Sequence, residues 1–252
     1  MWLRILLTVL AYVLSAAAVE AQEKPYRVAL VGDGFDGKAW HTGVLISLDP
    51  GWKTYWRMPG EAGVAPEFTW AASVPAEIDV LYPTPSRHAD QSGEAVGYEN
   101  EVLFPVVVNA GSATGLDLKL DLFFAVCKDI CIPASAQAAI RLGPAIADTD
   151  GAARVEDALK QIPETGTAVA SATLVSDGGK PQLLLSLTAK ADDIFVETAG
   201  SAYFHAPSFS PDGLEARLAI DNLKDPAKLS GAALKLTYRI DGRGFEQTVM
   251  LP

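Results

Sequence analysis

Apolar and polar residues alternate over short stretches along most of the chain, and Gly, Pro, Asn and Asp interrupt them. This pattern is typical of half-buried β-strands separated by turns. The segments expected to form strands are 26–31, 43–49, 53–58, 67–71, 78–82, 102–109, 116–126, 136–142, 168–175, 182–188, 194–197, 214–220, 233–241 and 245–251. Short strands at this spacing indicate an all-β protein built from sandwiches.

A single segment has the period of a helix, and it lies between the two strand-rich halves. In residues 150–163, DGAARVEDALKQIP, the residues Val155, Ala158, Leu159 and Ile162 share one face and Pro163 ends the run. We therefore expect two β-sandwich domains joined by a short helical connector. The expected boundaries are 22–145 for the first domain, 146–166 for the connector and 167–252 for the second domain.

The two cysteines of the chain, Cys127 and Cys131, are expected to face each other across a hairpin. The strand before them has apolar residues at even positions and mostly polar residues at odd ones, and the segment after them keeps the same parity. Pairing the cysteines places apolar residues opposite apolar ones and opposite charges together, as an antiparallel pair requires. The opposed pairs would be Leu116–Leu142, Leu118–Ile140, Leu120–Ala138, Asp117–Arg141 and Asp121–Gln137.

The same parity places both sulfurs on the outward face of the hairpin, away from the core leucines. Phe123 lies on this face and could dock a partner. The turn has no glycine, which leaves Asp129 as the residue able to adopt a left-handed conformation. Pro133 cannot donate a ladder hydrogen bond, so the return strand should be at an edge or bulged.

Three kinds of chemistry fit a C-x-x-x-C pair. An inert bridge over so short a loop would remove only about 2 kcal/mol of unfolded-state entropy. A structural zinc site needs four ligands, and the three histidines lie far away in the sequence, although a cuprous ion accepts two thiolates. An exchangeable couple needs an accessible sulfur and a thiolate, which Lys128 would favour and Asp129 would oppose. The spacing alone leaves all three open.

The amino terminus and the net charge restrict the compartment and the partners. Residues 1–21 combine Arg4, an apolar run and a small-residue site after Ala21, which indicates a secretory signal peptide. Cysteines of an exported protein are normally oxidised to each other. The chain has 20 Lys and Arg against 31 Asp and Glu, a net charge of −11, which disfavours nucleic acid as a partner.

Three motifs in order carry a resemblance to a known family: LDPGWKTYWRMPGEAG at 48–63, GYENEVLFPV at 97–106 and VCKDICIPA at 126–134. Together they resemble the periplasmic amino-terminal domain of DsbD-type thiol:disulfide interchange proteins, especially the subgroup associated with suppression of copper sensitivity. The resemblance implies an immunoglobulin-like sandwich, with the first domain covered well and the second more loosely. It also implies a periplasmic location and a redox-active pair in which Cys131 forms mixed disulfides and Cys127 resolves them.

The resemblance further implies a cap over the sulfurs, whose nearest counterpart is the polar stretch 85–100. We expect Tyr98 from this cap, together with Phe123, Lys128 and Asp129, to surround the pair or to contact partners. Neither a cofactor nor a metal is expected.

The expected partners are periplasmic thioredoxin-like oxidoreductases. DsbD-type proteins continue into a membrane domain, whereas this chain ends at Pro252, so we also expect a separate membrane electron donor. The alternative is a non-catalytic binding module, either a copper carrier or a scaffold with an inert bridge.

Overall fold

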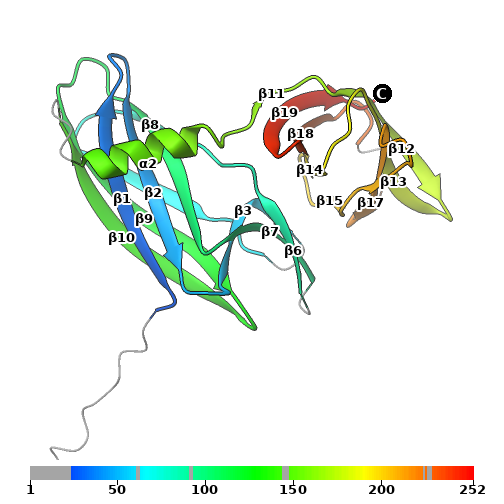
Figure 1. Ribbon diagram of the computed structural model, residues 1–252, viewed down its shortest axis with the longest axis horizontal. Coiled ribbons are helices and arrows are strands. Elements are labelled where there is room, and N and C mark those ends of the chain that lie inside the picture. Colours follow the sequence, from blue (N-terminus) through cyan, green and yellow to red (C-terminus); the bar gives the residue numbers. More distant parts are fainter. Residues whose placement is uncertain (1–23, 61–62, 91–92, 144–147, 224, 226–228) are drawn as a thin grey trace, which may run out of the picture.

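The chain folds into two β-sandwiches with one helix between them in the sequence (Figure 1). The structure is a computed structural model that describes residues 24–60, 63–90, 93–143, 148–223, 225 and 229–252. The expected signal peptide, residues 1–21, lies outside these residues. Among the described residues, none of the helical structure is long and apolar enough to cross a membrane.

The first sandwich packs two sheets against each other. One sheet has the order β1-β2-β8-β5, and the other has the order β10-β9-β3-β7-β6 with β4 also paired to β9. The strands are β1 Tyr26–Phe35, β2 Trp40–Leu48, β3 Lys53–Gly60, β4 Glu67–Ala72, β5 Glu77–Val80, β6 Ser86–Asp90, β7 Gly93–Glu99, β8 Glu101–Asn109, β9 Leu116–Cys127 and β10 Cys131–Leu142. The alternation of β9 decides its orientation, since Leu118, Leu120 and Leu122 are buried in the core between the sheets.

The expected register of the cysteine hairpin is confirmed. Cys131 pairs with Cys127, Leu142 with Leu116, and every pair between them follows the same register. β10 is the edge strand of its sheet, which accommodates Pro133 without a bulge. The turn is closed by a hydrogen bond from Lys128 N–H to Ile130 O of 3.3 Å, and Asp129 is not among the residues with positive φ.

Helix α2, Thr149–Leu159, covers one face of the first sandwich. Asp148 caps its amino terminus by accepting hydrogen bonds from the backbone N–H groups of Gly151 at 2.9 Å and Gly32 at 3.0 Å. These two bonds lower the pKa of Asp148 below its ordinary value. Val155 and Ala158 pack on Leu45 and Leu103, so the helix belongs to the first domain rather than spanning freely between the two.

The second sandwich is also formed by two sheets. Their orders are β11-β19-β18-β14 and β12-β13-β17-β15, with β16 also paired to β17. The strands are β11 Glu164–Thr165, β12 Val169–Asp177, β13 Lys180–Leu187, β14 Asp193–Glu197, β15 Tyr203–Phe204, β16 Ser208–Phe209, β17 Glu215–Asp221, β18 Ala233–Ile240 and β19 Arg243–Met250. Asp241 and Gly242 both have positive φ and form the two-residue turn of the β18–β19 hairpin, as an Asp-Gly pair between two alternating segments predicts.

The stretch 85–100, which we expected to be a polar loop, contains the hairpin β6–β7 instead. Its pattern is polar because one face of this hairpin presents Arg87 and Glu94 to the second domain rather than apolar residues to a core. Strands that pair through charged residues lack the apolar alternation by which strands are recognised.

The two domains meet through a partly apolar interface. Phe195 of β14 packs into the core cluster of the first domain, against the ring of Trp56 at a centroid distance of 5.7 Å. Beside it, the Arg57 guanidinium forms hydrogen bonds of 2.9 and 2.7 Å with the two carboxylate oxygens of Glu197. A third bond joins Arg57 to Glu246 of β19. These contacts attach β14 and β19 to the β3 side of the first sandwich.

Candidate redox site

The two sulfurs lie where β9 ends and β10 begins. Cys127 is the last residue of β9 and Cys131 the first of β10, and the register places them directly opposite each other. Their Cα atoms are 4.1 Å apart and the sulfurs form a disulfide bond. The bond therefore joins two neighbouring strands at the open end of a hairpin.

The two sulfur-bearing residues differ in exposure. Cys127 is buried, with 5% of its surface exposed, whereas Cys131 is exposed. The cause is their position in the sheet, because Cys131 starts an edge strand and Cys127 lies between that strand and β3. Cys131 is therefore the residue of the pair that lies at the solvent-facing edge of the sheet.

A buried tyrosine contacts the exposed cysteine. Tyr55 of β3 lies on the outward face of the sheet, and its hydroxyl oxygen is 3.2 Å from Sγ of Cys131. A disulfide sulfur has no proton, so the hydroxyl is the donor. Tyr55 also forms a small apolar cluster with Ala125 and Cys127, against which Ala95 of β7 packs. Nothing in the sequence marks a tyrosine on a neighbouring strand as a partner of a sulfur.

Charged residues flank the buried sulfur. Lys53 of β3 pairs with Cys127 on one side and with Glu99 of β7 on the other, so the three side chains start from the same face of the sheet. Lys128, which we expected to act on the sulfurs, donates instead to the carbonyl oxygen of Pro50 at 3.2 Å. An ammonium group near a sulfur favours its thiolate form, and Lys53 is the lysine whose Cα pairs with that of Cys127.

Two exposed apolar residues lie on the hairpin that carries the sulfurs. Phe123 is 42% exposed on the outward face of β9, four residues before Cys127. Ile130, adjacent to Cys131 in the turn, is 68% exposed, and no local sequence pattern predicts this. Lys128 and Asp129 are also exposed in this turn.

Tyr98 lies on the opposite face of the sheet from the sulfurs, which corrects our expectation. It pairs with Thr54, and Thr54 pairs with Val126, so the three share the core face. Its hydroxyl donates to the carbonyl oxygen of Pro83 at 2.8 Å and its ring packs edge-on against Phe104. Burial raises the pKa of Tyr98 well above its ordinary value. The apolar environment that a tyrosine ring prefers explains this orientation.

His88 of β6 is on the face that carries the sulfurs. It pairs with Ala95, and its Nδ1 is 3.0 Å from a carboxylate oxygen of Glu99. Among the described residues, no group of three or more His, Cys, Asp or Glu side chains is arranged to hold a metal ion.

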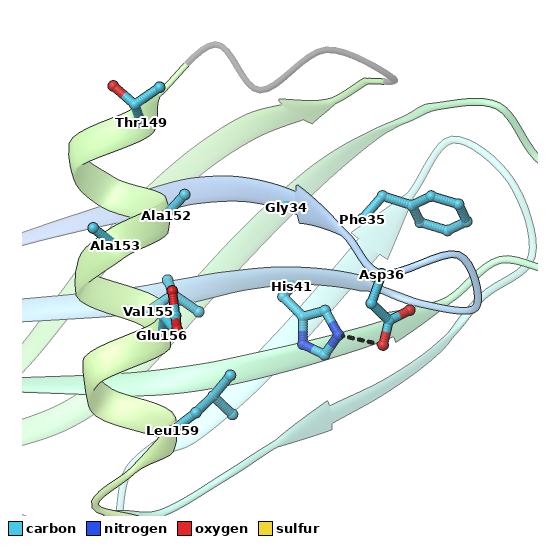
Figure 2. A pocket seen from close by; sticks show the side chains of 10 residues that line it. All are labelled: Gly34, Phe35, Asp36, His41, Thr149, Ala152, Ala153, Val155, Glu156 and Leu159. Carbon is cyan, nitrogen blue, oxygen red and sulfur yellow. Dashed lines mark hydrogen bonds and ion pairs between the residues drawn. The ribbon is translucent and has the colours of Figure 1, made fainter.

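Apart from the disulfide, the first domain has a concave region between α2 and the ends of β1 and β2 (Figure 2). Its volume is about 460 Å³, and Val155 and Leu159 contribute apolar surface. His41 Nε2 is 3.0 Å from a carboxylate oxygen of Asp36 at its rim. Backbone N–H groups of Ala39 and Lys38 and the bond to His41 hold the pKa of Asp36 far below its ordinary value. This hollow contains no cysteine and lies by α2, away from the β9–β10 turn (Figure 1).

A known family and a solved structure are similar to this chain, and both similarities include the cysteine-bearing domain. Residues 22–141 match the family described as "Thiol:disulfide interchange protein DsbD, N-terminal". The fold is similar to that of the N-terminal periplasmic domain of ScsB from Proteus mirabilis, with a TM-score of 0.71 and 22% sequence identity. That similarity covers 92% of this chain and 96% of the solved chain, so it includes both sandwiches. A search of curated proteins finds no match. The first sandwich of this chain, with its cysteine hairpin, therefore matches the DsbD N-terminal domain family.

Proposed function

We propose that this protein exchanges dithiol for disulfide with other proteins through Cys127 and Cys131. The observation that carries the proposal is the difference in exposure within the bond, since one sulfur is open to a partner and the other is buried at 5% exposure. A crosslink that served stability alone would gain little here, because it joins strands that the hairpin already holds and closes a very short loop.

The difference in exposure supports an order of bond changes. A thiolate of the reducing partner attacks Sγ of Cys131, forming a mixed disulfide and releasing Cys127 as a thiolate. The second thiol of the partner loses its proton to solvent. The resulting thiolate attacks the partner sulfur that is bound to Cys131, and Cys131 is released as a thiolate. The partner dithiol is thereby oxidised to a disulfide, and this protein is reduced by two electrons.

Delivery of the electrons reverses these steps. The Cys131 thiolate attacks the disulfide of a second protein, and the released partner thiolate takes a proton from solvent. The Cys127 thiolate then attacks Sγ of Cys131 and frees the second partner thiol. The Tyr55 hydroxyl would donate a hydrogen bond to the Cys131 thiolate, and the neighbouring Lys53 would favour the Cys127 thiolate.

The proposed partners are thioredoxin-like oxidoreductases of the periplasm, with a membrane protein as the electron donor. The periplasmic location is supported by the similarity to a periplasmic domain. Ile130 beside Cys131 and Phe123 further along β9 supply exposed apolar surface on which a partner of this kind would dock.

Trapping of mixed disulfides tests the proposal. A Cys127→Ala form retains the exposed sulfur but lacks the resolving one, so it should accumulate a disulfide-linked complex with a thioredoxin-like protein, released by dithiothreitol. The matched Cys131→Ala form retains only the buried sulfur and should accumulate much less. Equal trapping by both forms, or trapping by neither, would contradict the proposal.

A further inference from the structure

The β6–β7 hairpin lies between the second domain and the face that bears the sulfurs. The two faces of this hairpin carry different residues. Arg87 and Glu94 belong to the face turned toward the second domain, whereas His88 and Ala95 belong to the face that carries Tyr55 and Cys127. The hairpin therefore connects the second domain to the redox pair, in addition to the contacts that β3 makes through Trp56 and Arg57.

The first contact with the second domain is made by Arg87 of β6. Its Nε is 2.9 Å from Oδ1 of Asp193, and its Nη2 donates to the carbonyl oxygen of Ile194 at 2.6 Å. The guanidinium also lies over the ring of Phe195, 4.6 Å from the centroid. The side chain is largely buried, so these charge-assisted bonds are protected from water.

Two further contacts hold both strands of the hairpin. Tyr203 of β15 donates its hydroxyl proton to the Glu94 carboxylate at 2.6 Å. Arg239 of β18 donates to the carbonyl oxygen of Pro85, directly before β6, at 2.6 Å. Glu94 also pairs with Arg87, so the two contact points are connected.

The opposite face of the hairpin packs closely on the redox site. Ala95 packs on the cluster formed by Tyr55, Ala125 and Cys127. At Gly97, β7 approaches β3 so closely that a Cβ added to this glycine would lie 2.0 Å from the carbonyl oxygen of Thr54. The hairpin therefore contributes to the burial of Cys127.

We infer that the second domain braces the β6–β7 hairpin against the redox site and so directs exchange to Cys131 rather than Cys127. The inference rests on the proposed function. Attack at Cys131 breaks the bond and releases Cys127 as a thiolate, whereas attack at Cys127 would release Cys131 and leave the partner bound to a buried sulfur. Arg87, Tyr203 and Arg239 are positioning residues in this account, since they act on the sulfurs through the hairpin.

Selective labelling of the reduced full chain tests the brace. Limiting iodoacetamide followed by peptide mapping gives the ratio of label on Cys131 to label on Cys127. Arg87→Met removes the bonds to Asp193, Ile194 and Glu94, which should make opening of the hairpin at least roughly tenfold more frequent and lower the ratio by a similar factor. Amide hydrogen exchange in β7 should accelerate in parallel. Arg141→Met, which removes an exposed arginine of the same domain, is the matched control and should leave both measurements unchanged.

An unchanged ratio in folded Arg87→Met would overturn the inference. Should Arg87→Met fail to fold, Tyr203→Phe decides, because it removes only one hydroxyl and should lower the ratio by roughly threefold. An unchanged ratio in that variant would then overturn the inference. These measurements use a small reagent and this chain alone, so failure to trap a protein partner would contradict the proposed function without affecting them.

Discussion

Arg57→Met should weaken the attachment of the two domains and lower the stability of the chain. The Arg57 side chain is 22% exposed, and its guanidinium binds Glu197 at two points and Glu246 at one. Methionine keeps an unbranched apolar side chain, but it removes the guanidinium that lies over the Trp56 ring and leaves two largely buried carboxylates without this cation. Breaking a fully buried pair costs about 3–5 kcal/mol, so for these partly exposed groups we expect about 2–3 kcal/mol.

Thermal unfolding followed by circular dichroism measures this cost. For a chain of this size, a loss of about 2–3 kcal/mol corresponds to a decrease in Tm of about 4–12 °C. Arg141→Met is the control, because its pair with Asp117 is formed by an arginine side chain that is 79% exposed and should contribute less than about 1 kcal/mol. A decrease in Arg57→Met no larger than that of the control would refute the reasoning.

The loss of stability caused by Arg57→Met should also depend on pH. Burial acts to raise the pKa of Glu246, but hydrogen bonds from Lys235 and Arg57 outweigh it and hold that pKa below its ordinary value. A carboxyl of this kind stabilises the fold above its unfolded pKa of about 4.3, and the contribution is lost as the pH falls through the lowered folded value. The Tm difference between wild type and Arg57→Met should therefore be constant near pH 7 and decrease below about pH 4. A difference that persisted unchanged in acid would contradict this assignment.

Three other substitutions have defined outcomes. Tyr55→Phe should raise the pKa of the reduced Cys131 thiol by about 0.5–1 unit, measured by thiolate absorbance. Tyr98→Phe, on the opposite face of the sheet, should leave this pKa unchanged. Equal shifts in the two variants would exclude a specific role of Tyr55. Leu118→Ala should destabilise the chain by about 2–5 kcal/mol in urea unfolding, because this side chain is fully buried, and a smaller loss would mean that the core can collapse around it. Gly242→Ala should cost about 1 kcal/mol in the same assay, since φ there is +78°, and no loss would show that the turn can change type.

The hairpin that carries the cysteines could be predicted from the sequence to the level of single residue pairs. The reason is physical: its apolar and charged residues alternate over a long stretch, and a slip of one residue would expose Leu118 and bury Asp117. The turn residues Asp241 and Gly242 gave a similarly strong signal for the β18–β19 hairpin.

The surroundings of the sulfurs could not be predicted in the same way. Tyr55 contacts Cys131 only because β3 lies beside β9, a long-range pairing that local alternation does not encode. The β6–β7 hairpin escaped prediction because Arg87 and Glu94 occupy positions where a strand normally carries apolar residues. Both features depend on what packs against a segment rather than on the segment itself.

The reduction potential of the Cys127–Cys131 pair tests the central claim, that this bond is exchangeable, most directly. The full chain would be equilibrated in glutathione or dithiothreitol buffers at pH 7, and the fraction of free thiol would be read by alkylation and mass spectrometry. We predict a potential between roughly −120 and −270 mV, the range of proteins that pass electrons between thiols. A value below about −300 mV, the range of structural disulfides, would contradict the account.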